Sequence, residues 1–184
     1  MATIAVVSEA DDRQECSISL RLATIGDIPA LMEIVRLVVP MMRAAQNFQW
    51  NDDYPNPEVF EEDIAAGFLW VTELDGHVAG VIALTTDQTP EYADAGWDIT
   101  EPSVVVHRLA VHPQFRGKGV VAALMQHAEV VARERGVAQV RTDTNTKNAA
   151  MRGLMPKLGY LLAGEIDLKI RPGLRFLCYE KKVQ

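Results

Sequence analysis

Residues 104–122 have the sequence VVVHRLAVHPQFRGKGVVA. The β-branched start of this stretch predicts a buried strand over residues 103–111. A proline and two glycines at 112–119 predict a turn, and apolar residues at helical spacing predict a helix over 120–135. Another short strand is expected at 138–142. Strand, turn, helix and strand in this order predict a parallel strand pair joined by a right-handed crossover.

The turn carries the residues Arg116-Gly117-Lys118-Gly119 directly before the helix. Glycines let a backbone approach a ligand closely, and a helix N-terminus offers unpaired N–H groups at the positive end of its dipole. Phosphate is the common occupant of such a site. The residues therefore predict phosphate binding. The alternative is a tight turn whose basic side chains are merely solvated.

The remaining elements predict one α/β (α+β) domain. A hairpin is expected at Asp75-Gly76 between two strands, and Pro40 is expected to kink or divide the first helix. The expected order is β-α-α-β-β-β-α-β-α-β-β, a mixed, mostly antiparallel central sheet flanked by helices. Residues 17–184 are expected to form the domain, and residues 1–16 are expected to form a flexible N-terminal extension. The other expected strands span 18–22, 68–74, 77–85, 161–168 and 174–180, and the other helices begin near 27, 58 and 148.

A dinucleotide site is a competing interpretation. Residues 117–122, GKGVVA, fit the fingerprint GxGxxA, and Asp143 lies near the end of the next strand. However, five residues separate the strand from the first glycine, and only one βαβ unit is predicted. No GK followed by Ser or Thr has the spacing of a Walker A loop. The phosphate compound is therefore not expected to be a dinucleotide.

Two segments together resemble the GNAT acetyltransferases. Residues 109–120, LAVHPQFRGKGV, are similar to motif A, written [RQ]-x-x-G-x-[GA] after a strand. Counted from Arg116, the motif places Val121 where Gly or Ala is usual; counted from Gln114, every letter fits but the helix start fits less well. Downstream, Asn148-Ala149-Ala150-Met151 and 157–160, KLGY, resemble the N-x-x-A and K-x-G-[FY] parts of a second element. The resemblance covers residues 18–182.

The resemblance implies acetyl-CoA as co-substrate and direct attack of an amine on its thioester. The pantetheine arm would pair with the strand backbone, and amides after the strand would hold the pyrophosphate. The residues implied in cofactor binding are Leu109, Ala110, Val111, Arg116, Gly117, Lys118, Gly119, Val120, Val121 and Asn148.

Catalysis needs a base for the amine, and the family usually supplies a Tyr as acid for the departing thiolate. That Tyr position is Met155 here, which cannot donate a proton. His107 and Asp143 are the candidate catalytic residues, with His107 preferred because histidine titrates near neutral pH. Glu73 is a weaker candidate.

The acceptor is expected to be a small cationic amine, bound by the N-terminal half. Residues 44–107 contain 13 acidic and no basic residues, whereas residues 108–184 contain 14 basic and 6 acidic ones. Such segregation suits an anionic cofactor and a cationic acceptor. The expected substrate wall consists of the aromatic residues Trp50, Tyr54 and Trp97 and the acids Asp52, Asp53 and Glu101.

Composition limits the other functions. The net charge of −7 argues against nucleic acid as a partner. No apolar run reaches the roughly 18 residues of a membrane helix, and two cysteines without a CxxC pair predict no metal site and a reduced, cytoplasmic compartment. Dimerisation is common in the resembled family, so a homodimer is one expectation. The alternative function is a non-catalytic acyl-CoA-binding sensor of the same fold.

Overall fold

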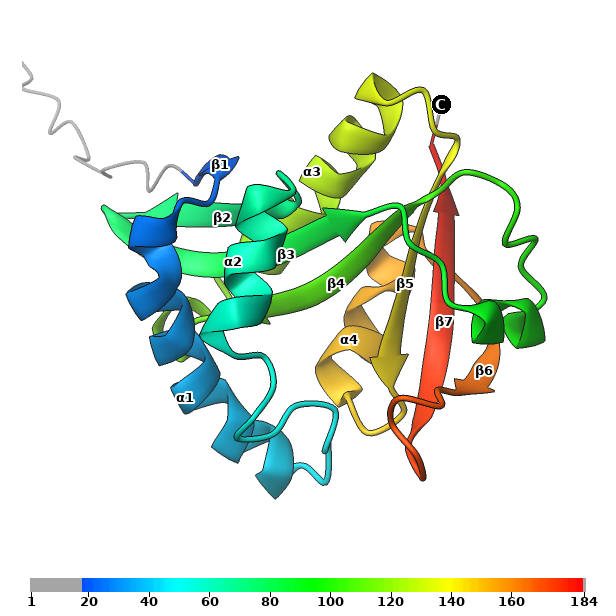
Figure 1. The fold of residues 1–184 in the computed structure, drawn as a ribbon, viewed down its shortest axis with the longest axis horizontal. Helices are drawn as coiled ribbons and strands as arrows, with labels where there is room; N and C mark the ends of the chain where they lie inside the picture. The colour runs from blue at the N-terminus through cyan, green and yellow to red at the C-terminus, as the bar shows by residue number, and fades with distance from the viewer. Residues whose placement is uncertain (1–17, 184) are drawn as a thin grey trace, which may run out of the picture.

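A computed structural model describes residues 18–183. The predicted flexible extension, residues 1–16, lies outside the described residues. Seven strands form one sheet in the order β1-β2-β3-β4-β5-β7-β6 (Figure 1). Among the described strands, β4 and β5 form the single parallel pair, and the other pairs are antiparallel. The strands are β1 (Ser19–Leu22), β2 (Leu69–Leu74), β3 (His77–Thr85), β4 (Val104–Val111), β5 (Gln139–Asn145), β6 (Leu161–Asp167) and β7 (Arg175–Lys182).

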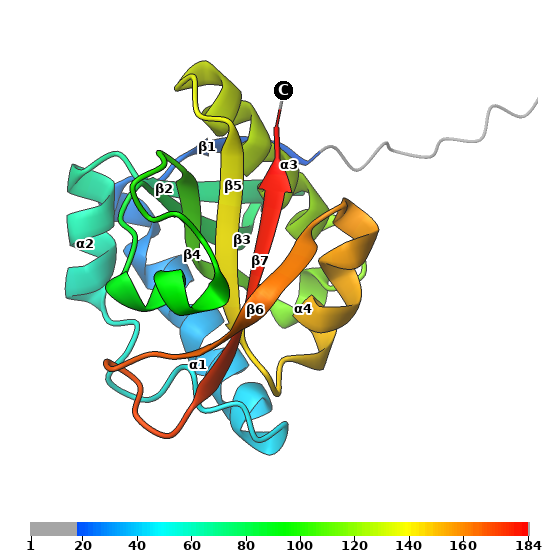
Figure 2. The ribbon, with the colours of Figure 1, turned by 90° about the vertical axis from the view of Figure 1, so that its right-hand side faces the viewer.

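Four α-helices cover the two faces of the sheet. They are α1 (Ile28–Ala44), α2 (Pro57–Ala65), α3 (Val120–Glu134) and α4 (Ala149–Leu154). Figure 2 shows α1 and α2 on one side of the sheet and α3 and α4 on the other. The element order and the mixed, mostly antiparallel sheet confirm the predicted fold class. A doubly wound dinucleotide fold is excluded, because it needs a largely parallel sheet.

Strand β3 is buried on both faces and separates two apolar clusters. Val81 and Ala83 pack with α1 and α2, whereas Ile82 and Leu84 pack with α3. This alternation follows from the two-residue repeat of a strand. Gly80 is required by the close approach of α3, because a Cβ there would lie 2.7 Å from the Cγ1 atom of Val120.

Of the two outcomes expected at Pro40, division of the first helix is wrong, and the last helix is shorter than expected. Pro40 lies inside α1 without dividing it, since the loss of one hydrogen bond is tolerated where the rest of the helix is packed. The helix expected over 148–158 ends at Leu154, and a 3-10 turn follows from Pro156 to Leu158. The hairpin at Asp75-Gly76 is confirmed, with positive φ angles of 52° and 76°.

The β4–β5 pair opens shortly after it begins. Pairing joins Val104–Val106 to residues 140–142 and stops there. Beyond that point β4 continues across the view of Figure 1 while β5 turns toward β7. On its other edge β4 carries a bulge, because Ala83 pairs with His107 while Val81 pairs with Ala110. Arg108, with φ at 49°, supplies the extra residue.

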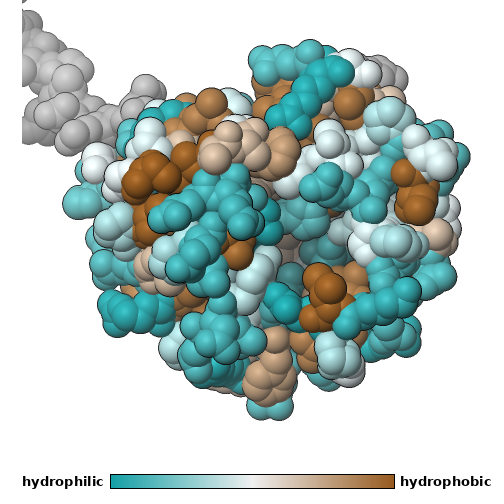
Figure 3. Space-filling view, in the orientation of Figure 1, coloured by the Kyte–Doolittle hydropathy of each residue, from teal (hydrophilic) through white to brown (hydrophobic). Residues whose placement is uncertain are grey.

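The surface is mainly polar. Figure 3 shows hydrophilic side chains over most of one face and apolar side chains in separate small patches. Within residues 18–183, every helix is too short or too polar to cross a membrane.

Candidate active site

A cavity of about 930 Å³ occupies the opening between β4 and β5. One side is formed by the end of β4, the start of α3 and the start of α4. The other side is formed by the loop after α1 and by the loop between β6 and β7. The cavity is therefore lined by elements from both the N-terminal and the C-terminal half of the chain.

The start of α3 forms an amide-rich end of the cavity. Gly117 and Gly119 line it with φ angles of 77° and 82°, and Gly119 is the N-cap of the helix. The first hydrogen bond of the helix runs from the Ala123 amide to the Gly119 carbonyl at 3.0 Å. The amides that precede Ala123 in the first turn thus have no partner within the helix. This geometry suits an anion.

The predicted cofactor residues gather at this end, with one exception. Lys118 does not line the cavity; its Nζ atom lies 5.3 Å from the centre of the Phe115 ring. The helix begins at Val120, so the motif counted from Arg116 places Gly119 at the N-cap and Val121 in the first turn. The predicted residues that line the cavity are Leu109, Ala110, Val111, Arg116, Gly117, Gly119, Val120, Val121 and Asn148.

Asn148 is held by local hydrogen bonds at the start of α4. Its Oδ1 atom accepts from the Met151 amide at 3.3 Å, and its Nδ2 atom donates to the Thr144 hydroxyl at 2.9 Å. The side chain therefore fixes the start of α4 against the end of β5.

His107 lines the cavity as a neutral imidazole. Burial and, to a smaller extent, the positive charge of Arg108 lower its pKa to about 4, although a hydrogen bond with the backbone of Asp87 acts in the opposite direction. Protonation of His107 is thus unfavourable near neutral pH, which makes it a poor proton acceptor.

Asp143 lies on β5, where β4 has diverged. Burial raises the pKa of its carboxyl group above the usual value, and a hydrogen bond from Tyr92 lowers it in part. The Tyr92 hydroxyl donates to the Oδ2 atom at 2.6 Å. Burial of the phenol raises the pKa of Tyr92 well above its usual value, and the neighbouring charge of Asp143 raises it further. Tyr92 therefore keeps its proton and acts as a donor to Asp143.

Arg108, at the bulge of β4, is held by an ion pair and a phenol. Its Nε and Nη2 atoms contact the carboxylate of Asp63 at 2.5 and 2.7 Å. Its Nη1 atom donates to the Tyr54 hydroxyl at 3.1 Å. The positive charge of Arg108 is thus balanced by Asp63 on α2, and the bulge is fixed to the loop after α1.

The aromatic residues expected to bind the acceptor do not all reach the cavity. Trp50 and Tyr54 line it. Trp97 does not; its ring packs against Tyr92 at 5.0 Å between centroids and against the guanidinium of Arg141, also at 5.0 Å. Trp97 therefore packs against Tyr92 without lining the cavity.

The acidic segment does not face the acceptor, contrary to expectation. Of the 13 acids in residues 44–107, Asp87 alone lines the cavity. The others that were expected nearby are engaged elsewhere: Asp52 pairs with Arg43, and Glu101 pairs with Arg141. Glu73, the weaker base candidate, pairs with Arg21 at 2.7 Å on β1. The net charge of residues 44–107 did not predict which side chains line the cavity, because net charge does not depend on side-chain direction.

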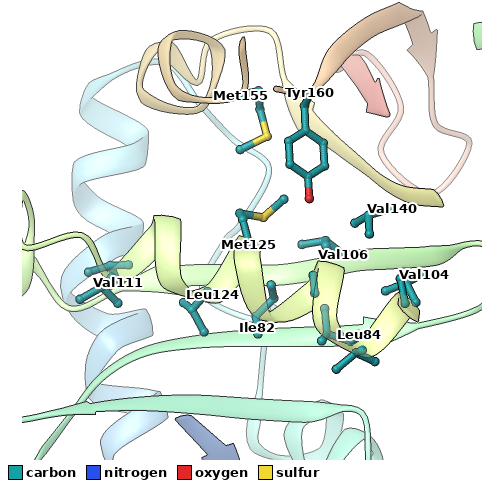
Figure 4. Close-up of a cluster of buried hydrophobic side chains, with 14 of the residues drawn as sticks. Ile82, Leu84, Val104, Val106, Val111, Leu124, Met125, Val140, Met155 and Tyr160 are labelled. Atoms are coloured by element: carbon teal, nitrogen blue, oxygen red, sulfur yellow. The ribbon is translucent and has the colours of Figure 1, made fainter. Parts of the chain in front are cut away.

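Met155 is part of the core. It is fully buried beside Met125, and Figure 4 shows its side chain directed into the cluster formed with Val106 and Tyr160. It contributes packing and no proton. Within the described chain, no three His, Cys, Asp or Glu side chains are grouped to hold a metal ion.

An open parallel strand pair that leads to an amide-rich helix start is the arrangement that the resemblance to acetyl-CoA-dependent acyltransferases implies. The chain belongs to the acetyltransferase (GNAT) family, whose model matches residues 33–160. The predicted resemblance is thereby confirmed.

Individual relatives agree with this family. N-acetylaspartate synthetase of Rattus norvegicus is 27% identical over 113 residues, which is 61% of this chain and 34% of that protein. The chain thus matches about a third of that relative's length. A GNAT family acetyltransferase from Streptococcus agalactiae is 27% identical, with a TM-score of 0.78 over 91% of this chain and 96% of that one. YncA from Salmonella typhimurium, solved with acetyl-CoA, shares the fold at 20% identity and a TM-score of 0.65, over 91% and 94% of the chains.

Proposed function

We propose that the protein transfers the acetyl group of acetyl-CoA to the primary amine of a small molecule. The acceptor is cationic in solution, because a free amine is protonated near neutral pH. The observation that carries the proposal is that Asp143, hydrogen-bonded to Tyr92, lines the same cavity as the glycine-rich start of α3. Family membership supports acetyl-CoA as the donor.

The donor is proposed to lie along the diverging edge of β4. The pyrophosphate binds the amides at the start of α3, where Gly117 and Gly119 leave the backbone accessible. The pantetheine arm follows Leu109 to Val111, whose backbone groups on this edge have no partner strand beyond Val106. The thioester then lies near the bulge, where a backbone N–H can stabilise the developing oxyanion.

Asp143 is proposed as the general base. It removes a proton from the ammonium group, directly or through water, through the Oδ1 atom that Tyr92 leaves free. The neutral amine attacks the thioester carbonyl, and the tetrahedral intermediate expels the CoA thiolate. The amide nitrogen loses its second proton to solvent. A raised pKa makes Asp143 a stronger base than an exposed aspartate, whereas His107 has a lowered pKa.

The thiolate leaves without a protein acid. Met155 is buried in the core, and the Tyr92 hydroxyl already donates its hydrogen bond to Asp143. A thiol has a pKa of about 8.5, so the thiolate is a stable leaving group that water can protonate. The missing tyrosine is therefore compatible with turnover.

Direct attack of the amine on the thioester is consistent with the state of the Cys178 thiol. Cys178, the cysteine within the described residues, is buried, and burial raises its pKa to about 12. A protonated, buried thiol is a poor nucleophile. This supports transfer in a ternary complex without an acyl-enzyme.

The proposal is tested by following release of CoA thiol with a panel of primary amines. Thiol release that depends on the amine, and that falls in an Asp143→Asn variant with unchanged acetyl-CoA affinity, supports it. Binding of acetyl-CoA without amine-dependent release would instead favour the acyl-CoA sensor.

A further inference from the structure

The acceptor wall of the cavity is the side formed by the loop after α1 and the loop between β6 and β7. It carries a positive charge that the proposed reaction does not use. Arg171 lies in the loop between β6 and β7, lines the cavity and is half-buried. Its guanidinium lies 4.5 Å from the centre of the Tyr54 ring, and its Nη1 atom donates to the carbonyl of Ile170 at 3.2 Å. Among residues 18–183, Arg171 forms no ion pair with a carboxylate.

The position of Arg171 is set by the same tyrosine that contacts the bulge. The Tyr54 ring stacks with Arg171, and its hydroxyl accepts from Arg108. Arg108 already has Asp63 as its anion, so Arg171 is the cation of this pair that is available to a ligand. Because stacking on Tyr54 restricts the guanidinium, an anion bound there costs less side-chain entropy.

The acceptor wall is also tied to β5, which carries the proposed base. The Gln49 side chain in the loop after α1 accepts from the Asn145 amide at 3.1 Å. Lys147, two residues further along, lines the cavity as a second cation. The acids that line the cavity are Asp143 and Asp87. The cavity lining thus holds charges of both signs, with Asp143 as an acid and Arg171 as a cation without a carboxylate partner among the described residues.

Apolar side chains line the same cavity. Trp50 and Leu168, which are buried, line the cavity together with Met42. A purely cationic acceptor would leave Arg171 facing a like charge, and an acceptor without an anion would leave it unpaired.

We infer that the acceptor is a free amino acid with an apolar side chain, whose carboxylate binds Arg171 while its amine faces Asp143. This inference names an acceptor for the site proposed above and therefore rests on that proposal. Arg171 acts as a specificity residue; its guanidinium fork matches a carboxylate in two parallel hydrogen bonds.

The test uses the full chain, acetyl-CoA and the apolar amino acids, each compared with its methyl ester. The ester removes the carboxylate charge and keeps the amine and the side chain. An Arg171→Met variant keeps most of the side-chain length and removes the charge. Comparing variant with wild type for each acceptor cancels differences in amine basicity.

We expect Arg171→Met to lower kcat/KM about 10- to 100-fold for the free amino acid, the range of a hydrogen bond to a charged group. The same change should alter kcat/KM for the ester by less than about twofold. Arg175→Met is the matched control: Arg175 lies four residues away, pairs with Glu165 and Asp167 and does not line the cavity. It should leave both acceptors unaffected.

The outcomes separate this inference from the proposed function. Equal loss for amino acid and ester, or loss of acetyl-CoA affinity in Arg171→Met, overturns the role of Arg171 while transfer stands. If no acceptor is acetylated, calorimetry with the amino acids in the presence of CoA decides. Binding that Arg171→Met abolishes keeps the role of Arg171 in carboxylate binding and rejects transfer to the amino acid. No binding rejects the inference alone, and thiol release with the panel of primary amines then decides whether transfer stands.

Discussion

The Tyr92 hydroxyl donates a 2.6 Å hydrogen bond to the Oδ2 atom of Asp143, linking the segment before β4 to the open end of β5. Tyr92 is almost fully buried and lies in an apolar cluster with Trp97 and Phe176. The bond therefore fixes one carboxylate oxygen and leaves the other for a ligand. Its consequences for the pKa of Asp143 can be measured.

Removing this hydroxyl should shift the acidic limb of the rate profile. The hydrogen bond from Tyr92 lowers the pKa of Asp143, so Tyr92→Phe raises that pKa further. The base is then protonated over a wider pH range, and kcat/KM at pH 6 falls more than kcat/KM at pH 8. The profile of kcat/KM against pH measures the shift. Tyr160→Phe, at a buried tyrosine outside the cavity, should leave it unchanged; a limb that moves to lower pH in Tyr92→Phe contradicts the assignment.

Asp143 and His107 can be separated as candidate bases. Asp143→Asn should lower kcat about 100- to 10,000-fold, the usual contribution of a general base, with acetyl-CoA affinity unchanged. His107→Gln should retain the acidic limb, because the pKa of His107 is about 4 and the residue is already neutral over the working range. Steady-state kinetics at several pH values distinguish the two. Loss of the limb in His107→Gln alone would assign the base to His107.

A negative charge at the start of α3 should prevent cofactor binding. Gly119→Glu places a carboxylate beside the amides proposed to hold the pyrophosphate, so affinity for acetyl-CoA should fall about 100-fold or more. Gly136→Glu is the control, because Gly136 also has a positive φ and open space but lies at the other end of α3. Calorimetry of both variants measures the effect. Equal affinities would show that the cofactor lies elsewhere.

His107 should make the protein less stable in acid. Its folded-state pKa of about 4 lies below the unfolded value of 6.5, so the unfolded state binds more protons between these values and stability falls as the pH drops from about 6.5 to about 4. The loss attributable to His107 is of the order of 1–3 kcal/mol. Asp143, with a raised pKa, acts in the opposite direction, so wild type must be compared with His107→Gln. Urea unfolding at pH 7.5 and 5 measures the difference; parallel losses in both proteins would contradict it.

The sequence predicted the parts of the site that depend on neighbouring residues. The anion-binding end is defined locally by two glycines, a basic pair and a helix start within residues 116–120. The strand before this turn was predicted from its β-branched residues. Asn148 was likewise placed by its short motif. These features need no long-range contact to be recognised.

The acceptor end could not be predicted in this way. Tyr92 and Asp143 are 51 residues apart, and Tyr54 and Arg171 are further apart still. No spacing rule connects them, because a sheet joins them only after folding. Trp97 was expected in the wall for the same reason that Tyr92 was overlooked: both lie in the segment between β3 and β4, Tyr92 in a short 3-10 helix and Trp97 in the loop after it, and the sequence does not reveal their side-chain directions. The cytoplasmic compartment and the homodimer stay predictions.

The most direct test of acetyl transfer follows the acetyl group itself. Wild-type protein is incubated with isotope-labelled acetyl-CoA and the apolar amino acids, and the label is located by mass spectrometry. The account predicts label in an amide on the acceptor nitrogen, strongly reduced in Asp143→Asn and absent in Gly119→Glu. Label that stays on CoA although acetyl-CoA binds would contradict it and identify a non-catalytic acyl-CoA-binding protein.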